Sequence, residues 1–272
     1  MPAIFLWLLT LLLKNSKMKI SRIEKGGLMK YTAEYRYDNL THLEFEFNGK
    51  KAIVLLPDNK NGKTIIKTEY FAAFPNLQNE MLRRGYTLIF LLNKNRWGTP
   101  SEVDDQYEFI NFASKEFDIS NKVITIGMSC GGMMSILLAS KYPDCIEALY
   151  LDAPVVNYLS CPARFGNAVD VTDGMWQEFE SAWNMSKSEL LTFREHPLDK
   201  IDELIKNKIR IYMAYGDSDR TVPYDENGIA IEKAYLSNNL EKLLFLDRKV
   251  GVDHHPHGPT DIDIAIKFLV GE

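Results

Sequence analysis

Short apolar runs recur along most of the chain, and helix-like segments separate most of them. Such runs, rich in Val, Ile and Leu, are typical of strands buried on both faces of a parallel sheet. The runs are AIVLL (52–56), TLIFLL (87–92), VITIGM (123–128), ALYLDA (148–153), IRIYMAY (209–215) and the more amphipathic KLLFLDRK (242–249). Because strands that alternate with helices imply right-handed crossovers, we expect an α/β fold with a doubly wound, mostly parallel sheet.

The remaining segments complete this expected architecture. YTAEYRY and HLEFEF, which follow each other after residue 30, alternate apolar with polar residues and predict half-buried antiparallel strands before the parallel ones. Helical spacing predicts helices at 69–84, 103–117, 132–142, 224–238 and 261–270. We therefore expect one domain over residues 31–272.

Composition limits the classes of function. The 272 residues are 46% apolar and 25% charged, which suits a soluble globular domain and disfavours disorder. The net charge of −5, without long runs of one sign, argues against a nucleic-acid partner. Cys130, Cys145 and Cys161 lack metal-ligand spacing, so we expect free thiols, a reducing cytoplasmic compartment and no metal site.

An apolar leader begins the chain, within residues 1–30. As a helix, residues 2–13 span about 18 Å, too short for about 30 Å of hydrocarbon, so we expect no stable membrane span. No basic residue precedes this stretch and no small-x-small site follows it, unlike a secretory signal. Three interpretations stay open: an accessory helix on the domain or at an interface, an upstream extension with Met18 or Met29 as initiator, and a degenerate signal.

One interval, at about 157–206, interrupts the alternation of strands and helices. It is rich in aromatic residues with helical spacing, Trp176 among them. It is interpreted as a surface insertion with its own small core, or as a lid over the carboxyl ends of the strands, where open α/β sheets bind ligands. The two interpretations are compatible, and we expect an inserted helical lid.

The sequence Gly127-Met128-Ser129-Cys130-Gly131 comes directly after the run VITIGM and before a helical pattern. A G-x-S-x-G at a strand-turn-helix junction is typical of a nucleophile elbow, because the glycines permit a sharp turn that projects the serine hydroxyl above the sheet. The alternative is an ordinary turn with an incidental serine. The position of the motif favours a nucleophilic Ser129.

A serine nucleophile needs a base within hydrogen-bond reach, and the base needs an acid that orients it. On such a sheet these partners follow later strands, in the order acid and then histidine. IRIYMAY runs into GDSDRTVP (216–223), and the last strand runs into GVDHHPH (251–257). Both kinds of partner are therefore available in the required order.

Taken together, these motifs resemble the α/β-hydrolase superfamily of serine hydrolases, from about residue 51 to residue 270. The resemblance implies Ser129 as nucleophile, Asp219 as acid and His254 as base. Asp217 in the same loop and Asp152 at the end of an earlier strand are rival acids, but the Val-Pro ending of the loop favours Asp219.

The tetrahedral oxyanion requires preorganised donors, and one is expected to be the backbone N–H of Cys130, the residue after the nucleophile. The family often has a His-Gly pair after its first strand of this type, as a second donor. This chain has Pro57-Asp58-Asn59 after AIVLL instead, and our hypothesis for the donor is Asn59. The Cys130 side chain is expected to be a small packed group.

Substrate contacts are expected from the loop after TLIFLL and from the lid. Trp97 either stacks on a substrate ring or covers the strand ends, and Trp176 is our lid candidate for substrate binding. Arg96 either binds a substrate carboxylate or is solvated. His255 and His257 are expected to shape the histidine loop or to face solvent.

The expected function is hydrolysis of a small-molecule carboxylic ester through an acyl-enzyme, with no metal or organic cofactor. Two alternatives remain: a prolyl-oligopeptidase-like serine peptidase, which shares the same residues, and a catalytically inactive binding protein on a hydrolase fold. TEYFAAFP (68–75) and LYLDAPV (149–155) are similar to a bacterial subgroup that includes peptidase-like proteins and esterases, which does not fix a substrate. The sequence makes no prediction of oligomeric state.

Overall fold

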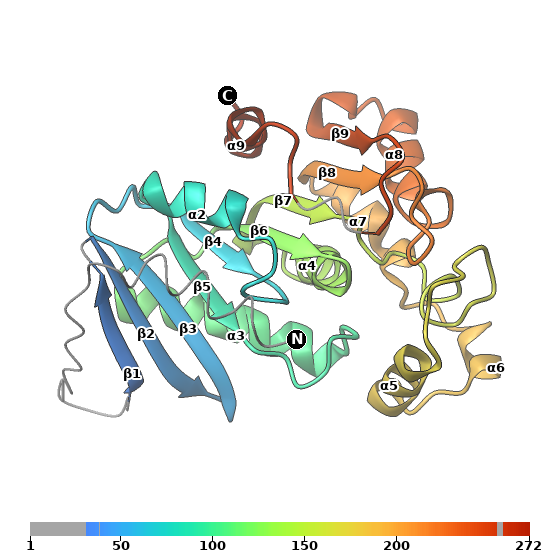
Figure 1. Cartoon of the computed structure of the whole chain (residues 1–272), viewed down its shortest axis with the longest axis horizontal. Coiled ribbons are helices and arrows are strands. Elements are labelled where there is room, and N and C mark those ends of the chain that lie inside the picture. Colours follow the sequence, from blue (N-terminus) through green and yellow to red (C-terminus); the bar gives the residue numbers. More distant parts are fainter. Residues whose placement is uncertain (1–30, 38, 255–257) are drawn as a thin grey trace.

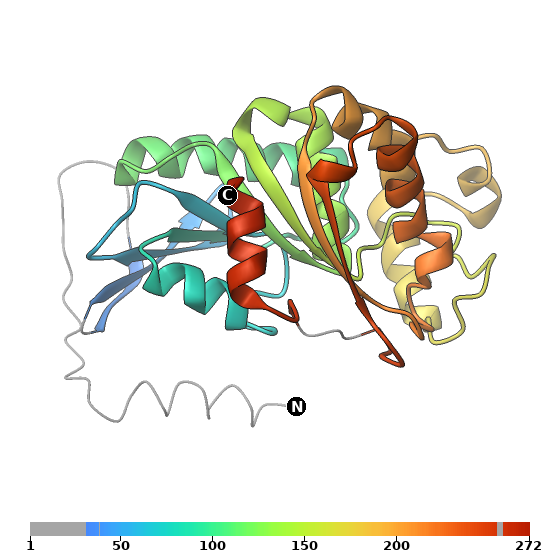
Figure 2. The same cartoon turned by 90° about the horizontal axis from the view of Figure 1, so that it is seen from above.

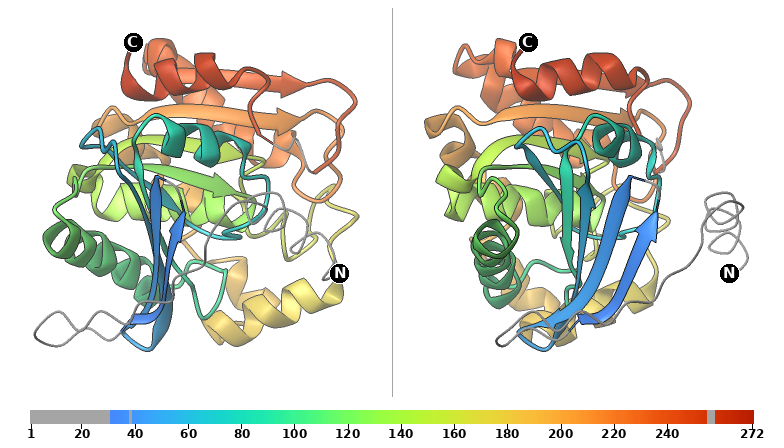
Figure 3. Two further views of the ribbon diagram at one scale, coloured as in Figure 1. Left: turned by 60° about the vertical axis from the view of Figure 1, so that its left-hand side comes forward. Right: turned by 90° about the vertical axis from the view of Figure 1, so that its left-hand side faces the viewer.

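The computed structural model describes residues 31–37, 39–254 and 258–272, and in these residues nine strands form one sheet (Figure 1). Their order across the sheet is β1-β2-β3-β5-β4-β6-β7-β8-β9. The strands are β1 (Tyr31–Tyr37), β2 (Leu40–Phe47), β3 (Lys50–Pro57), β4 (Thr64–Lys67), β5 (Thr87–Leu91), β6 (Val123–Met128), β7 (Ile146–Asp152), β8 (Arg210–Gly216) and β9 (Leu244–Lys249). Figure 3 shows the strong twist between the blue strands β1 to β3 and the orange end of the sheet.

Helices cover both faces of the sheet (Figure 2). They are α2 (Asn76–Arg83), α3 (Pro100–Phe117), α4 (Cys130–Lys141), α5 (Asp173–Trp183), α6 (Lys187–Leu190), α7 (Ile201–Lys206), α8 (Gly228–Ser237) and α9 (Ile262–Val270). Side chains of α3, α4, α7 and α8 form one core with the sheet, including Phe109 and Leu138. Those of α2 and α9, including Met81 and Leu269, form the core on the other face. The doubly wound arrangement predicted from the sequence is confirmed.

The run AIVLL lies in β3, and β3 is antiparallel to both of its neighbours instead of belonging to the parallel set. It is apolar because both of its faces are covered: Val54 lies in one core and Ile53 in the other. Composition therefore predicted the strand correctly and its direction wrongly. The parallel strand missing from the prediction is β4, which pairs with β5 and β6 and has only four residues.

The chain after β4 is not helical at first. We predicted a helix at 69–84, but α2 begins only at Asn76. Tyr70 and Phe74 have φ values of 51° and 46°, which a right-handed helix excludes. Residues 68–75, called the β4–α2 loop below, therefore form an irregular connection at the carboxyl end of β4.

Residues 157–206 connect β7 to β8 and are called the β7–β8 segment below. The side chains of Thr172 and Ser186 cap α5 and α6 by accepting backbone hydrogen bonds, which explains where these helices begin. Phe179 of α5 is fully buried, and its ring lies 4.9 Å from that of Tyr158. The aromatic residues of the β7–β8 segment thus extend the core of one sheet face.

The arrows of β6 to β9 point toward the side on which α5 and α6 lie (Figure 1). This carboxyl edge of the parallel strands is the edge at which the motif-bearing loops emerge. In the described part of the chain, no helix has the length and apolar character needed to cross a membrane. The predicted leader in residues 1–30 and the predictions for His255 and His257 lie outside the described residues.

Candidate active site

Ser129 occupies the sharp turn between β6 and α4. Its φ of 52° and ψ of −116° are strained for a residue with a side chain, and such strain is typical of functional positions. Its N–H donates to the carbonyl oxygen of Asp152 at 2.8 Å, so the adjacent strand β7 holds the turn. The strand-turn-helix geometry expected of a nucleophile elbow is present.

The glycines beside Ser129 are required by close packing. A Cβ on Gly127 would lie 2.4 Å from the backbone oxygen of Gly131, and a Cβ on Gly132 would lie 2.6 Å from Cβ of Pro154. Both distances are shorter than any non-bonded contact allows. The helix α4 can approach its strand, and so present Ser129, only because these positions lack side chains.

His254 and Asp219 lie next to Ser129, although 125 and 35 residues separate the two contacting pairs in the sequence. Nε2 of His254 is 3.1 Å from Oγ of Ser129, and Nδ1 of His254 is 2.8 Å from Oδ2 of Asp219. Asp219 is 8% exposed and His254 is 9% exposed. The histidine therefore contacts the serine on one side and a carboxylate shielded from water on the other.

The acid loop itself fixes the Asp219 carboxylate. Its Oδ1 accepts hydrogen bonds from the backbone N–H groups of Thr221, at 2.9 Å, and Val222, at 2.8 Å. This leaves Oδ2 for the histidine. The Thr-Val-Pro ending of the loop thus has a physical role: it supplies the donors that orient the carboxylate.

The rival acids have other partners. The Asp217 carboxylate accepts from the backbone N–H of Gly251 at 2.7 Å and from Arg248 at 2.8 Å, and these contacts lower the pKa of Asp217. Asp152 accepts from the backbone N–H of Gly258 at 2.9 Å, and burial raises its pKa. Asp217 thus ties the acid loop to the loop after β9, and Asp152 anchors the chain that returns from the histidine loop.

Cys130 is the first residue of α4, so its backbone N–H lies at the amino end of that helix, beside Ser129. The thiol is buried, and burial raises the pKa of Cys130 to about 11. It is therefore protonated at neutral pH and is not a competing nucleophile. All three cysteines are free and buried, and the described residues contain no His, Cys, Asp and Glu cluster suited to a metal ion.

The structure contradicts the hypothesis that Asn59 supplies an oxyanion donor. Because β3 is antiparallel to β5, the chain after β3 emerges at the edge where the parallel strands begin. A Cβ on Gly85, which precedes β5, would lie 2.2 Å from the backbone oxygen of Asn59. Ser129 follows the end of a parallel strand, so Asn59 lies at the opposite edge of the sheet.

The β4–α2 loop, in contrast, lies at the same edge of the sheet as Ser129. A Cβ on Gly131 would be 3.1 Å from Cβ of Glu69, so this loop packs directly against the elbow. Tyr70 lies close enough to Cys130 for the two side chains to interact electrostatically, and burial raises the pKa of Tyr70, so the phenol keeps its proton. Sequence reasoning missed Tyr70 because the strand before it is too short to be recognised.

Arg96 connects the β4–α2 loop to the β7–β8 segment. Its Nη1 donates to the Tyr70 hydroxyl at 3.2 Å, and its Nε donates to the Glu178 carboxylate on α5 at 2.8 Å. Its side chain is 29% exposed, whereas that of Glu178 is 53% exposed. These contacts argue against the expectation that the Arg96 side chain is purely solvated.

The two tryptophans proposed as substrate contacts differ in environment. Trp97 is 1% exposed and its ring meets that of Phe179 edge-on at 5.6 Å, so it covers the strand ends and has no free face for a substrate ring. The substrate-stacking hypothesis for Trp97 is therefore not supported. Trp176 is only partly buried, and Nζ of Lys187 lies 5.1 Å from the centre of its ring.

Lys67 is a second residue that the sequence did not indicate. It ends β4, is 2% exposed, and donates from Nζ to the backbone oxygen of Ala73 in the β4–α2 loop at 3.1 Å. Burial lowers the pKa of Lys67 to about 8, an effect that the negative charge of Asp152 opposes. A single lysine after two isoleucines carries no sequence signal of burial.

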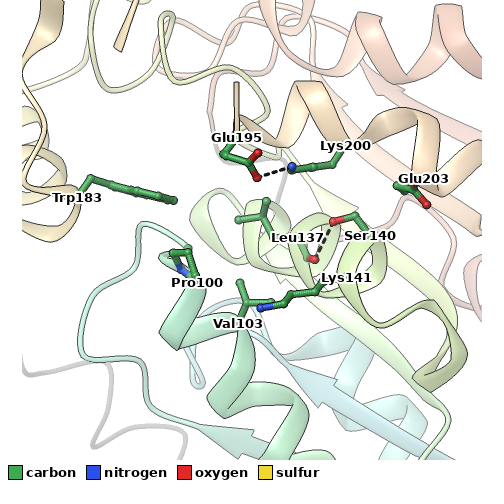
Figure 4. Close-up of a pocket in the computed structure, with 10 residues that line it drawn as sticks. Pro100, Val103, Leu137, Ser140, Lys141, Trp183, Glu195, Lys200 and Glu203 are labelled. Atoms are coloured by element: carbon green, nitrogen blue, oxygen red, sulfur yellow. Dashed lines mark hydrogen bonds and ion pairs between the residues drawn. The ribbon is translucent and has the colours of Figure 1, made fainter. Parts of the chain in front are cut away.

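A separate pocket of about 330 Å³ lies along the far half of α4 (Figure 4). Leu137 and Lys141 line it from α4, Trp183 lines it from α5, and Glu195 and Lys200 form an ion pair at its rim. Eight residues of helix, about 12 Å, separate Leu137 from the elbow, so this hollow is not the space into which Ser129 projects.

Solved structures with this fold include esterases and a peptidase. A variant of the esterase rPPE aligns with a TM-score of 0.58 and 17% identity, over 100% of this chain and 88% of that chain. A fungal esterase from Rhizomucor miehei has a TM-score of 0.59 and 14% identity, over 85% and 81%. Dipeptidyl peptidase 4 from Porphyromonas gingivalis has a TM-score of 0.59 and 14% identity, over 87% of this chain but only 36% of its own.

These likenesses confirm the predicted fold. Together with the match of the chain to the profile of a hydrolase family, they define the class: the chain is a serine hydrolase with an α/β-hydrolase fold. No curated protein is significantly similar in sequence. The prolyl oligopeptidase family profile matches residues 90–246, which is more than half of the chain. The protein therefore belongs to the prolyl oligopeptidase family.

Proposed function

We propose that the protein hydrolyses small-molecule carboxylic esters, with Ser129 as nucleophile, His254 as general base and Asp219 as the orienting acid. The observation that carries this proposal is the continuous contact of the three side chains, 3.1 Å from serine to histidine and 2.8 Å from histidine to aspartate. Both distances lie in the range that proton transfer and imidazole orientation require.

The reaction follows from these contacts. Oγ of Ser129 attacks the acyl carbon while Nε2 of His254 accepts its proton, and Asp219 stabilises the imidazolium that forms. His254 then donates this proton to the departing alkoxide, which leaves an acyl-Ser129 ester. A water that loses its proton to His254 attacks the acyl carbon, and the second tetrahedral intermediate collapses as His254 returns that proton to Oγ of Ser129, which releases the acid and restores the free enzyme.

Two groups at the elbow support the proposal of an oxyanion hole. The backbone N–H of Cys130 begins helix α4, and Tyr70 belongs to the β4–α2 loop, which packs against the elbow at Gly131. We assign the backbone of Cys130 and the hydroxyl of Tyr70 as the oxyanion donors. Each such donor contributes about 2.7–4 kcal/mol to lowering the barrier in serine hydrolases.

We also propose that residues 31–272 form one domain and that the β7–β8 segment acts as its lid. Figure 1 places α5 and α6 on the side toward which the parallel strands point. Helix α5 also contacts the loop after β5, through Arg96 and Glu178. Trp176, which is partly exposed on α5, is our candidate for substrate contact within this lid.

A serine peptidase is the second candidate function. It is favoured by membership of the prolyl oligopeptidase family and by the likeness to a dipeptidyl peptidase. A Ser-His-Asp triad can attack amides as well as esters. Ester hydrolysis is favoured because this chain and the esterases align over most of both lengths. In contrast, this chain spans only about a third of the peptidase.

The test is a panel of p-nitrophenyl esters of different acyl length and aminoacyl p-nitroanilides, assayed with the wild-type protein, Ser129→Ala and His254→Ala. We expect ester turnover in the wild type and its loss in both variants. Faster amide than ester turnover would establish the peptidase, and turnover that persists in Ser129→Ala would refute the mechanism. Failure of the wild type on the whole panel would favour a binding protein.

A further inference from the structure

A line of side-chain contacts runs from Ser129 to the lid. Cys130 directly follows Ser129, and its side chain interacts electrostatically with that of Tyr70. The Tyr70 hydroxyl accepts from Nη1 of Arg96 at 3.2 Å, and Nε of Arg96 donates to Glu178 of α5 at 2.8 Å. The elbow, the β4–α2 loop, the loop after β5 and helix α5 therefore meet through consecutive side chains.

The contact with Arg96 determines what the Tyr70 hydroxyl can do. A phenol has a single proton to donate and lone pairs that accept. Because the guanidinium has no acceptor, its N–H must occupy a lone pair of the Tyr70 oxygen, which directs the hydroxyl proton away from Arg96 and leaves it for another acceptor. A charge-assisted bond to the oxygen also polarises the O–H and makes it a stronger donor.

Helix α5 is joined to the same loop at more than one point. Nε1 of Trp183, the last residue of α5, donates to the backbone oxygen of Trp97 at 3.0 Å. The rings of Trp97 and Phe179 pack edge-on in the core. Only Glu178, however, contacts the Arg96 guanidinium from α5. The position of helix α5 is therefore coupled to Arg96, the side chain that contacts Tyr70.

We infer that Arg96 is a positioning residue that aims the Tyr70 hydroxyl at the oxyanion, and that Glu178 holds Arg96 in this pose when helix α5 is docked. This inference rests on the proposed function, in particular on Tyr70 as an oxyanion donor. Its consequence is that the lid contributes to the rate of the chemical step through one ion pair, in addition to any contact with the substrate.

A double-mutant cycle between Tyr70 and Arg96 tests the inference. kcat and KM are measured for the p-nitrophenyl ester that the wild type hydrolyses fastest, with Tyr70→Phe, Arg96→Met and the double variant. We expect kcat to fall about 100-fold in Tyr70→Phe and about tenfold in Arg96→Met, with KM unchanged. In the Tyr70→Phe background Arg96→Met is expected to change kcat less than about twofold, because no hydroxyl remains to be aimed.

Ion-pair variants on α5 provide matched controls. Glu178→Gln is expected to lower kcat about threefold, in the direction of Arg96→Met and only when Tyr70 is present. Asp173→Asn removes the ion pair of α5 with Arg164, at 2.9 Å and within the β7–β8 segment, and is expected to leave kcat unchanged. Arg96→Lys, which keeps the charge, is included as a further variant. Melting temperatures of all variants distinguish a loss of folding from a misoriented Tyr70 hydroxyl.

The outcomes are distinguishable. If Arg96→Met lowers kcat equally in both backgrounds, or alters only KM for substrates that bear a carboxylate, Arg96 does not act through Tyr70 and the inference is overturned. If Tyr70→Phe retains full kcat while Ser129→Ala is inactive, the second oxyanion assignment fails and the inference fails with it. If Ser129→Ala remains active, it is the proposed function itself that fails.

Discussion

The carboxylate of Asp219 contacts the ring of His254 at 2.8 Å, across 35 residues of sequence. Asp217, only two positions before Asp219, binds Gly251 and Arg248 instead. Two acids in one short loop therefore have different surroundings: Asp219 is almost fully buried beside the histidine, whereas the carboxylate of Asp217 links surface loops. This difference gives a direct test of which acid orients the base.

Asp219→Asn should lower kcat by about 10⁴, because an amide stabilises the wrong imidazole tautomer while keeping the geometry. Asp217→Asn should change kcat less than about threefold, since its contacts lie outside the site. Both values come from initial rates on a p-nitrophenyl ester, with circular dichroism as a check on folding. A comparable loss in the two variants would show that the acid has been misassigned.

Asn59→Ala should leave kcat and KM within about twofold of the wild type, because Asn59 is exposed at the edge of the sheet opposite Ser129. The matched comparison is Tyr70→Phe, which removes one hydroxyl from the correct edge. Steady-state kinetics on the same ester measure both. A fall of more than about tenfold in Asn59→Ala would contradict the antiparallel placement of β3.

Trp97→Ala should lower the free energy of unfolding by about 3–5 kcal/mol, because it removes a large, fully buried side chain from the core. Trp176→Ala should cost less than about 1 kcal/mol, since its ring is partly exposed, and should raise KM for esters with bulky acyl groups. Urea denaturation and steady-state kinetics separate the two effects. A stable Trp97→Ala protein with a raised KM would restore the stacking hypothesis.

Lys67 should make stability depend on pH in a specific window. Burial lowers its pKa to about 8, below the ordinary value of 10.5. Between these values the unfolded chain binds a proton that the native protein has lost, so native stability rises with pH. The wild-type free energy of unfolding, minus that of Lys67→Met, should therefore rise by up to about 3 kcal/mol from pH 8 to pH 10.5.

Below about pH 8 both states hold this proton, so the same difference should be constant between pH 6 and about pH 7.5. Subtracting the variant removes the contributions of tyrosines and exposed lysines, which titrate in both proteins. Denaturation curves at a series of pH values provide the measurement. A difference that stays flat from pH 8 to pH 10.5 would mean that Lys67 titrates as an exposed lysine does.

Elements defined by burial could be predicted well from the sequence. The run VITIGM had to be a buried strand, and a glycine was required at position 127, where any Cβ would meet the Gly131 oxygen. The proximity of Asp219 and His254 to Ser129 also followed from local motifs, because each motif comes directly after a strand. Such patterns act over a few residues, and so they are readable without knowledge of the fold.

Strand direction could not be predicted in the same way. A strand buried on both faces has the same composition whether its neighbours run parallel or antiparallel, and β3 and β6 look alike in sequence. The four-residue strand β4 was missed for a related reason, since its apolar run is too short to stand out. Because that strand was missed, the β4–α2 loop and the position of its Tyr70 could not be predicted.

The chain therefore encodes locally which residue types follow each strand: a serine in a glycine-rich turn, an acid in a Val-Pro loop and a histidine in the last loop. Only the tertiary structure decides which further residues face that serine. It excludes Asn59, brings Tyr70 beside Cys130, and joins Arg96 to Glu178 across 82 residues. The physical reason is that the edge at which a loop emerges is set by strand order and direction, which depend on pairing between distant segments.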